Sequence, residues 1–213
     1  MCGEFGSMPV IGEPAPDFEA LTTAGTVKLS DFKGKWLVLF SHPADFTPVC
    51  TTEFIAFSQI AEELKSLNVQ LMGLSVDSVH SHLAWIRNIK EKMGVDIPFP
   101  IIADLDMKVA RKYGMIHPAQ SSTAAVRAVF FIDDKGILRA MIYYPLTAGR
   151  FMPEIVRLVK SLQTTDKYGV ATPANWQPGD KVVVPAPKNK EEMDKRLSEG
   201  YECRDWYLCF KKL

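Results

Sequence analysis

An apolar run at residues 36–40 is followed closely by a helical pattern, and this combination is compatible with few folds. From Thr51 onward the apolar residues recur at steps of three and four positions: Phe54, Phe57, Ile60, Ala61, Leu64 and Leu67. The run predicts a fully buried strand, and the period predicts a helix of about four turns with one face against a core.

The same alternation continues along the chain. Further strands are predicted at residues 27–29, 69–76 and 99–103, and two further helices at Leu83, Ile86, Ile89 and Met93 and at Met107, Ala110 and Tyr113. Residues 129–132 and 137–144 predict an antiparallel hairpin, and Pro153 predicts the first turn of a helix running to about Leu162. This order of elements implies βαβ units and an α/β fold.

Beyond Tyr168 the composition shifts toward proline and charge, and only residues 182–184 and 191–197 predict a strand and a helix. The aromatic residues of this tail are costly to leave in water, so we expect it to cover a neighbour instead of forming its own core. We read residues 1–7 as a cloning scar before a natural start at Met8. The predicted layout is then one domain over 8–165 and an extension over 166–213.

Charge and hydropathy exclude several classes of function. Lys and Arg (25) balance Asp and Glu (25), so no net field attracts nucleic acid or an anionic membrane surface. No apolar run approaches the roughly 20 residues that cross a bilayer, and no secretory signal is recognisable. We expect a cytoplasmic protein with neither a nucleic-acid nor a membrane partner.

The number of cysteines indicates reactive thiols, not structural disulfides. With Cys2 set aside, Cys50, Cys203 and Cys209 are an odd number in a chain with ample apolar residues for a core. The sequence has no CxxC pair and no Cys/His cluster with zinc spacing, so we predict no metal and no other cofactor.

Cys50 is the strongest candidate for reactivity. It follows the turn-rich residues 42–49 and falls in the first turn of the predicted helix, where free N–H groups and the dipole favour a thiolate. An inert buried cysteine is the alternative on position alone. The Thr47 hydroxyl can reach the same helix end, either as an ordinary N-cap or as a partner of sulfur and peroxide. Pro43 and Pro48 stiffen the loop.

Arg127 interrupts an apolar stretch at the start of a strand predicted to be central. A guanidinium that enters a core needs an anion, and both the Cys50 thiolate and Glu53 are candidates. The alternative is a structural Arg–Glu pair with no role in catalysis.

Residues 43–53 resemble the PxxxTxxC active-site motif of the peroxiredoxins, with the distal arginine at Arg127. The resemblance spans essentially Met8 to the C-terminus and is strongest to the one-Cys-type (peroxiredoxin-6-like) subfamily and its archaeal peroxide reductases. Further matches lie at residues 75–79, 82–85, 147–150 and 173–180. It implies a thioredoxin-like fold with a C-terminal extension that packs on the partner subunit, and homodimers that commonly form a decameric ring of five dimers.

The resemblance also implies site residues. Cys50 corresponds to the peroxidatic cysteine, Thr47, Pro43 and Arg127 to the residues that hold thiolate and peroxide, and His42 to an active-site histidine. Further residues expected around the site are Val49, Glu53, Arg150 and Trp85. The implied function is reduction of hydrogen peroxide and small organic hydroperoxides through a sulfenic acid, with a thioredoxin- or glutaredoxin-like reductant.

The C-terminal cysteines resemble the pair of the archaeal members. We assign Cys209 as the resolving residue, bridging to Cys50 across the dimer, and Cys203 as its exchange partner. Two packing cysteines among aromatic residues are the alternative. The Val-Cys-Pro resolving motif of typical two-Cys members is absent, and residues 30–34 lack the GxSxG motif associated with phospholipase activity.

Other functions remain open from the sequence. A holdase chaperone built from the same ring can coexist with the peroxidase. A thioredoxin-type disulfide reductase is disfavoured because Thr47 stands where a CxxC motif needs its second cysteine. A Cys/His hydrolase using His42 as base lacks any recognisable acyl-binding motif.

Overall fold

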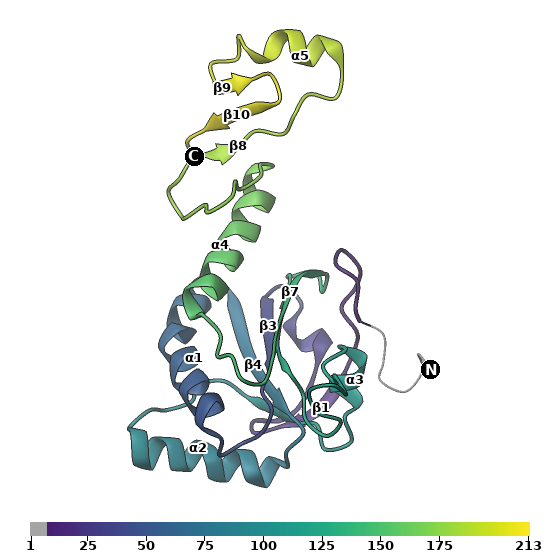
Figure 1. Ribbon diagram of the computed structural model, residues 1–213, viewed down its shortest axis with the longest axis vertical. Helices are drawn as coiled ribbons and strands as arrows, with labels where there is room; N and C mark the ends of the chain where they lie inside the picture. Colours follow the sequence, from purple (N-terminus) through teal and green to yellow (C-terminus); the bar gives the residue numbers. More distant parts are fainter. Residues whose placement is uncertain (1–7) are drawn as a thin grey trace. The chain divides into compact units, whose positions relative to one another are not determined.

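A computed structural model describes residues 8–213 of the chain (Figure 1). The residues that we read as a cloning scar lie outside the described part. The chain divides into two compact units, Met1–Met152 and Pro153–Leu213, and each is considered by itself below. In the described residues, no helix is long and apolar enough to cross a membrane.

The first unit is built on a seven-stranded mixed sheet with the strand order β2-β1-β5-β4-β3-β6-β7. Its strands are β1 (Glu19–Thr22), β2 (Gly25–Lys28), β3 (Trp36–Ser41), β4 (Val69–Ser75), β5 (Ile101–Ala103), β6 (Arg127–Ile132) and β7 (Leu138–Tyr144). β3 pairs with β4 in parallel and with β6 in antiparallel orientation. The α/β fold and the β6–β7 hairpin are therefore confirmed, whereas β1 carries no pattern that the sequence revealed.

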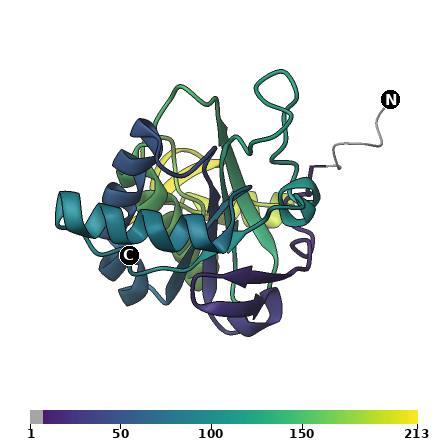
Figure 2. The same ribbon diagram turned by 90° about the horizontal axis from the view of Figure 1, so that it is seen from below.

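Helices cover both faces of this sheet. α1 (Pro48–Ser66) and α2 (Val79–Met93) lie on one face and the short α3 (Lys108–Lys112) on the other, and Figure 2 shows α1 and α2 together on their side. α1 connects β3 to β4 and α2 connects β4 to β5, and both pairs of strands are parallel. Because right-handed crossovers that move in the same direction along a sheet place their helices on the same face, α1 and α2 lie together. A one-turn 3-10 helix, η1 (Leu29–Phe32), follows β2.

The central strand explains the apolar run in the sequence. Every residue of β3 is buried, because helices cover both faces of the sheet around it and strands flank both edges. Aromatic side chains from α1 fill the face that they share with this strand: the Phe40 and Phe57 rings stack with centroids 3.8 Å apart. This packing fixes the position of α1 over the carboxyl end of β3.

The same end of the sheet receives three separate segments. The chain leaves β3 at Ser41, passes through a loop and enters α1 at Pro48. Because β6 runs antiparallel to β3, its first residue, Arg127, lies at that end. Phe46 holds the loop in a left-handed conformation (φ 55°), which is uncommon for a residue other than glycine.

The second unit contains α4 (Met152–Tyr168), which begins at its border, β8 (Val182–Val183), α5 (Lys190–Arg196), β9 (Glu202–Asp205) and β10 (Leu208–Lys211). The strands form a three-stranded sheet in the order β8-β10-β9. α4 continues to Tyr168 and does not end near Leu162, so the boundary that we predicted at 165/166 falls inside this helix.

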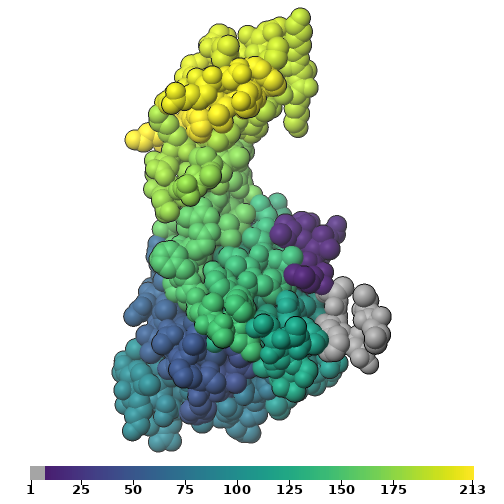
Figure 3. Space-filling view, viewed as in Figure 1, coloured from purple at the N-terminus to yellow at the C-terminus, as the bar shows by residue number. Residues whose placement is uncertain are grey.

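This unit has a small core of its own, contrary to the expectation for the tail. Trp176 is buried with Val170 and Val182, and its indole N–H donates to the carbonyl oxygen of Asp180 at 3.3 Å. The β9–β10 hairpin has no apolar alternation, so sequence periodicity did not predict it. Its tip exposes Trp206 and Tyr207, and Figure 3 shows the last residues (yellow) on the surface of the unit.

Candidate active site

Cys50 is the third residue of α1, and its thiol is free and fully buried. The helix begins as the sequence predicts: Thr47 is the N-cap residue with an extended backbone (φ −110°), and Pro48 takes the first helical position. The first N–H groups of a helix have no partner within it, so they and the helix dipole favour negative charge at this end. The backbone thus provides a suitable environment for a thiolate.

The Thr47 side chain does not act as a cap. Its hydroxyl donates to the carbonyl oxygen of Ala44 at 2.9 Å, and no side-chain capping bond forms at this helix end. A hydroxyl that has used its hydrogen still carries acceptor lone pairs. Thr47 therefore offers an acceptor near the start of α1, and the N-cap interpretation holds for its backbone alone.

Arg127 reaches both of the anions that the sequence suggested. Its Nη1 lies 3.3 Å from the Cys50 Sγ and 2.7 Å from a Glu53 carboxylate oxygen. Its Nε and Nη2 donate to the carbonyl oxygen of Leu146 at 3.0 and 2.8 Å, which fixes the plane of the guanidinium. The structure therefore brings together a thiol and an arginine that are 77 positions apart in the sequence.

A second buried guanidinium completes the charge balance. Arg150 donates to Glu53 through Nε and Nη2 at 2.8 and 2.6 Å, and through Nη1 to the carbonyl oxygens of Ser41 and Ala128. Burial opposes ionisation of Glu53, yet the charges and hydrogen bonds of Arg150 and the charge of Arg127 lower its pKa overall. Two guanidinium groups against one carboxylate leave an excess positive charge next to the sulfur.

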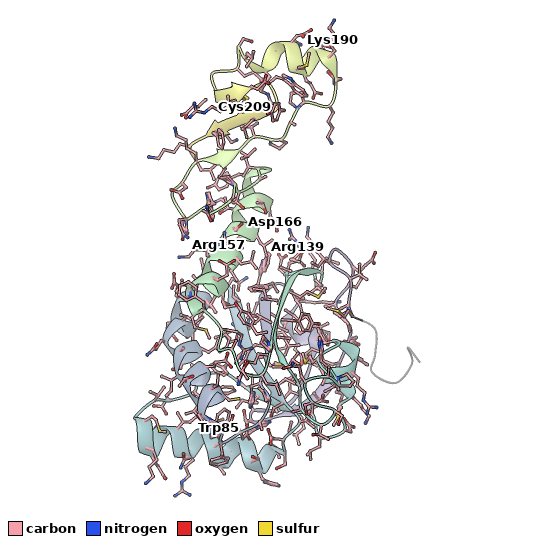
Figure 4. The ribbon with its side chains drawn as sticks, viewed as in Figure 1. Trp85, Arg139, Arg157, Asp166, Lys190 and Cys209 are labelled. Carbon is pink, nitrogen blue, oxygen red and sulfur yellow. A yellow bond between two sulfur atoms is a disulfide. The ribbon has the colours of Figure 1, made fainter. Side chains whose placement is uncertain are left out.

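His42 follows β3 directly and is fully buried, with its Nε2 2.9 Å from the Asp45 carboxylate. Its ring packs against Phe54 and Trp85, with centroids 4.7 and 5.1 Å away. Trp85 is 1% exposed, and in Figure 4 it lies on the side of α2 that faces the rest of the first unit. The structure thus brings these two predicted residues together.

Two residues next to His42 were missed by sequence reasoning. Asp45 also lies 2.8 Å from the Nδ1 of His82, which is fully buried on α2. Three side chains place atoms that can bind a metal ion within 4.8 Å of one another: His42, Asp45 and His82. Among the described residues, this is the group with the spacing that a metal site needs. Those facing atoms are already hydrogen-bonded to each other. No periodic signal links positions 37 residues apart, so only the fold reveals the cluster.

Pro43 lies in the loop and Val49 is the second residue of α1, and both are half-buried. A Cβ atom on Gly149 would lie 3.6 Å from the Val49 side chain, which places Val49 beside the segment that carries Arg150. The roles that the resemblance implies for Pro43 and Val49 stay predictions.

Cys203 and Cys209 lie in the second unit, on β9 and β10, where they form a disulfide. Cys209 is fully buried, and Figure 4 labels it in this unit. The two residues face each other in the antiparallel register, which explains why they can bridge across so short a hairpin. The link from Cys209 to Cys50 of another subunit stays a prediction.

A sheet with a thiol at the N-terminus of the helix after its central strand, faced by a buried arginine, defines a class of thiol-dependent oxidoreductase on a thioredoxin-like fold. Residues 11–141 match the AhpC/TSA family, and residues 161–200 match the C-terminal domain of 1-Cys peroxiredoxin. The chain belongs to the peroxiredoxin family, and it is a thiol peroxidase with a C-terminal extension.

Individual relatives agree with this assignment. A peroxiredoxin of Aquifex aeolicus is 65% identical, with 99% of this chain and 100% of the relative covered. Peroxiredoxin 2 of Caldanaerobacter subterraneus is 62% identical over 97% of this chain and 94% of the relative. A yeast mitochondrial 1-Cys peroxiredoxin has a TM-score of 0.86 at 43% identity, covering 97% of this chain and 100% of that one. Peroxiredoxin 6 of Arenicola marina, solved as a cysteine-to-serine mutant, has a TM-score of 0.86 at 41% identity, covering 96% of this chain and 98% of that one.

Proposed function

We propose that Cys50 is the peroxidatic residue and that it reduces hydrogen peroxide and small organic hydroperoxides. The thiolate attacks one peroxide oxygen, the O–O bond breaks, and the departing oxygen takes a proton to leave as water or an alcohol. Cys50 becomes a sulfenic acid. The observation that carries this proposal is the 3.3 Å contact between the Arg127 Nη1 and the Cys50 Sγ.

The surrounding groups favour this transition state over the ground state. Negative charge moves from the sulfur to the departing oxygen as the O–O bond stretches, so donors fixed along that line are most effective there. Arg127 is held rigidly by Leu146, and the first N–H groups of α1 contribute their dipole. The Thr47 hydroxyl, with its hydrogen committed to Ala44, accepts the peroxide O–H. Pro43 and Val49 shield the sulfur from water.

The sulfenic acid is resolved by the C-terminal cysteines of a second subunit. The thiol of the partner's Cys209 condenses with the sulfenic acid, which forms a disulfide and releases water. The partner's Cys203 thiolate then attacks the Cys209 sulfur, frees the Cys50 thiolate and leaves a Cys203–Cys209 disulfide. The bond between these two residues supports this proposal, because it is the product of that exchange.

A thioredoxin- or glutaredoxin-like protein then reduces the C-terminal disulfide. The yeast mitochondrial relative is described as undergoing thiol resolution via glutathione/thioredoxin systems, which supports the same class of reductant here. The cytoplasmic location stays a prediction.

The mechanism needs at least a homodimer, and we propose a decamer of five dimers. Support comes from β7, which ends the sheet and pairs with β6 alone among the described strands. An unpaired strand edge is a template for pairing with a second chain. Sedimentation of the reduced protein is expected to give the decamer mass, and a monomer at micromolar concentration would contradict this assembly.

Peptide mass spectrometry after brief exposure to hydrogen peroxide tests the site assignment. We expect Cys50 to be modified before Cys203 or Cys209, and Cys50→Ser to stop peroxide consumption. Equal or later modification of Cys50 would refute the assignment. In Cys203→Ser, where the exchange with Cys209 cannot proceed, oxidation is expected to give a dimer on non-reducing gels with Cys50 linked to Cys209. Persistence of that band when Cys209 is replaced by serine as well would overturn the resolving role.

A further inference from the structure

The two cysteines of the C-terminal disulfide differ in their access to solvent. Cys209 is fully buried, whereas Cys203 is half-buried. The neighbours of Cys203 in the chain, Glu202 and Arg204, are both exposed. The rate of thiol–disulfide exchange depends on which sulfur an incoming thiolate can reach. The two ends of this bond are therefore not equivalent to a reductant.

The strand order accounts for this difference. Cys209 lies on β10, the middle strand of the three-stranded sheet, which pairs with β9 on one side and with β8 on the other. The carbonyl oxygen of Cys209 also accepts from the Val184 N–H at 2.9 Å. Cys203 lies on β9, which pairs with β10 alone among the described strands. The open edge of β9 presents Cys203 to a second protein, because an unpaired edge can accept an extended segment.

The choice of the leaving sulfur opposes the effect of access. Attack on Cys203 expels the sulfur of Cys209, and burial disfavours a charged thiolate. The carbonyl oxygen of Asp205 lies 3.4 Å from the Cys209 Sγ and can accept an S–H once this sulfur has taken up a proton. A slow leaving group still reacts, but a sulfur without solvent access reacts only after β10 has opened. Access therefore decides which sulfur is attacked.

We propose that the reductant attacks the Cys203 sulfur, so that electrons enter the protein at this residue. The thiolate of the reductant bonds to the Cys203 Sγ, the Cys203–Cys209 bond breaks, and Cys209 leaves with the electron pair and takes up a proton. The second thiol of the reductant then attacks the first, which forms the reductant's own disulfide and releases the Cys203 thiol. This inference rests on the proposed function, in which Cys209 resolves the sulfenic acid. The first step therefore already restores the thiol that the next turnover needs.

A trapping experiment on a full-length variant tests this order of events. Cys2→Ser/Cys50→Ser keeps only the C-terminal pair of the four cysteines, and diamide closes the disulfide between them. The probe is a thioredoxin whose second active-site cysteine is replaced by serine, so that the mixed disulfide persists. N-ethylmaleimide caps the thiol that is released. Trypsin cleaves after Arg204 and so separates the two cysteines into the peptides 197–204 and 205–211.

We expect the probe on peptide 197–204 and the maleimide on peptide 205–211. The probe on the first peptide should be in about 10-fold excess over the probe on the second, because Cys209 reacts only in the small fraction of molecules in which β10 has opened. A probe attached mainly to peptide 205–211, or to neither peptide, would overturn the proposal.

Alkylation of the reduced wild type is a second measurement that does not depend on the folding of a variant. With limiting iodoacetamide we expect Cys203 to be modified before Cys209, because only Cys203 is accessible in the folded hairpin. The same reaction in urea is the matched control, and the difference should disappear there because the unfolded chain exposes both thiols. Faster modification of Cys209 in the folded protein would contradict the argument from access.

Failure of the proposed function looks different from failure of this inference. If peroxide did not oxidise Cys50 in the wild type, the peroxidase assignment would fail. The trapping experiment uses neither peroxide nor Cys50, so it would still decide which sulfur the reductant attacks. Conversely, a probe found on Cys209 would refute the entry of electrons at Cys203 and leave the oxidation of Cys50 by peroxide unaffected.

Discussion

Removing the Arg127 guanidinium is expected to slow Cys50 oxidation by about 100-fold. At the observed 3.3 Å, the attraction between the guanidinium and a thiolate is about 5 kcal/mol at an effective dielectric of about 20. Glu53 lies 2.7 Å from the same nitrogen and cancels part of this field, while Arg150 remains in the variant. We therefore expect Arg127→Gln to lose about 3 kcal/mol of transition-state stabilisation, which is about the loss on removing one hydrogen-bond donor from an oxyanion hole.

The assay is rapid mixing of the reduced protein with hydrogen peroxide, followed by tryptophan fluorescence. Trp85 packs against His42 and Phe54, so it is placed to report changes at the site. The second-order rate constant is compared among the wild type, Arg127→Gln and Arg127→Lys. We expect the lysine variant to fall between the other two, because it keeps a charge but cannot bond Leu146 through a planar fork.

Arg139→Gln is the matched control, since Arg139 is a half-buried arginine on β7 that pairs with Asp133 away from the sulfur. It is expected to oxidise at the wild-type rate. If Arg127→Gln reacted within about twofold of the wild type, a difference of under about 0.5 kcal/mol, the argument from the sulfur–guanidinium contact would be refuted.

Three further predictions concern the frame of the site. The buried Ser41 hydroxyl donates to the Val126 carbonyl oxygen and accepts from the Ala128 N–H, so Ser41→Ala is expected to lower the free energy of unfolding in urea by about 1–3 kcal/mol; no change in the urea midpoint would contradict this. Phe57→Ala removes a fully buried ring and is expected to cost about 3–5 kcal/mol in the same titration, unlike a surface substitution. Asp45 has its pKa depressed below the ordinary 3.8, so its contribution to stability is present above that pH and is lost as the pH falls further. Asp45→Asn should therefore be less stable at pH 7 and approach the wild type below pH 4, and a difference independent of pH would contradict the depressed pKa of Asp45.

Local patterns in the sequence were sufficient for the elements that carry Cys50. The apolar run of β3 and the helical period of α1 reflect burial of one strand and of one helix face, which depend on residues close together in the chain. For the same reason the start of α1, and the electrostatic environment of a cysteine in its first turn, could be predicted without a structure. The active-site motif added the identity of the partners, but no distance between them.

Which charged groups become neighbours in the site depends on contacts between distant parts of the chain. Arg127 bonds both Cys50 and Glu53 because β6 runs antiparallel to β3 and brings its first residue to the same end of the sheet. Arg150, which is 97 residues from Glu53 in the sequence, bonds the same carboxylate. The pairing of Asp45 with His82 depends likewise on the packing of α2.

The C-terminal hairpin shows the same division between sequence and structure. The two cysteines were visible in the sequence, but β9 and β10 were not, because four-residue strands that bury almost none of their side chains on either face carry little periodic signal. Sequence periodicity records which side of an element is buried. Which distant groups become neighbours depends on strand order and register, and these emerge only when the whole sheet is assembled.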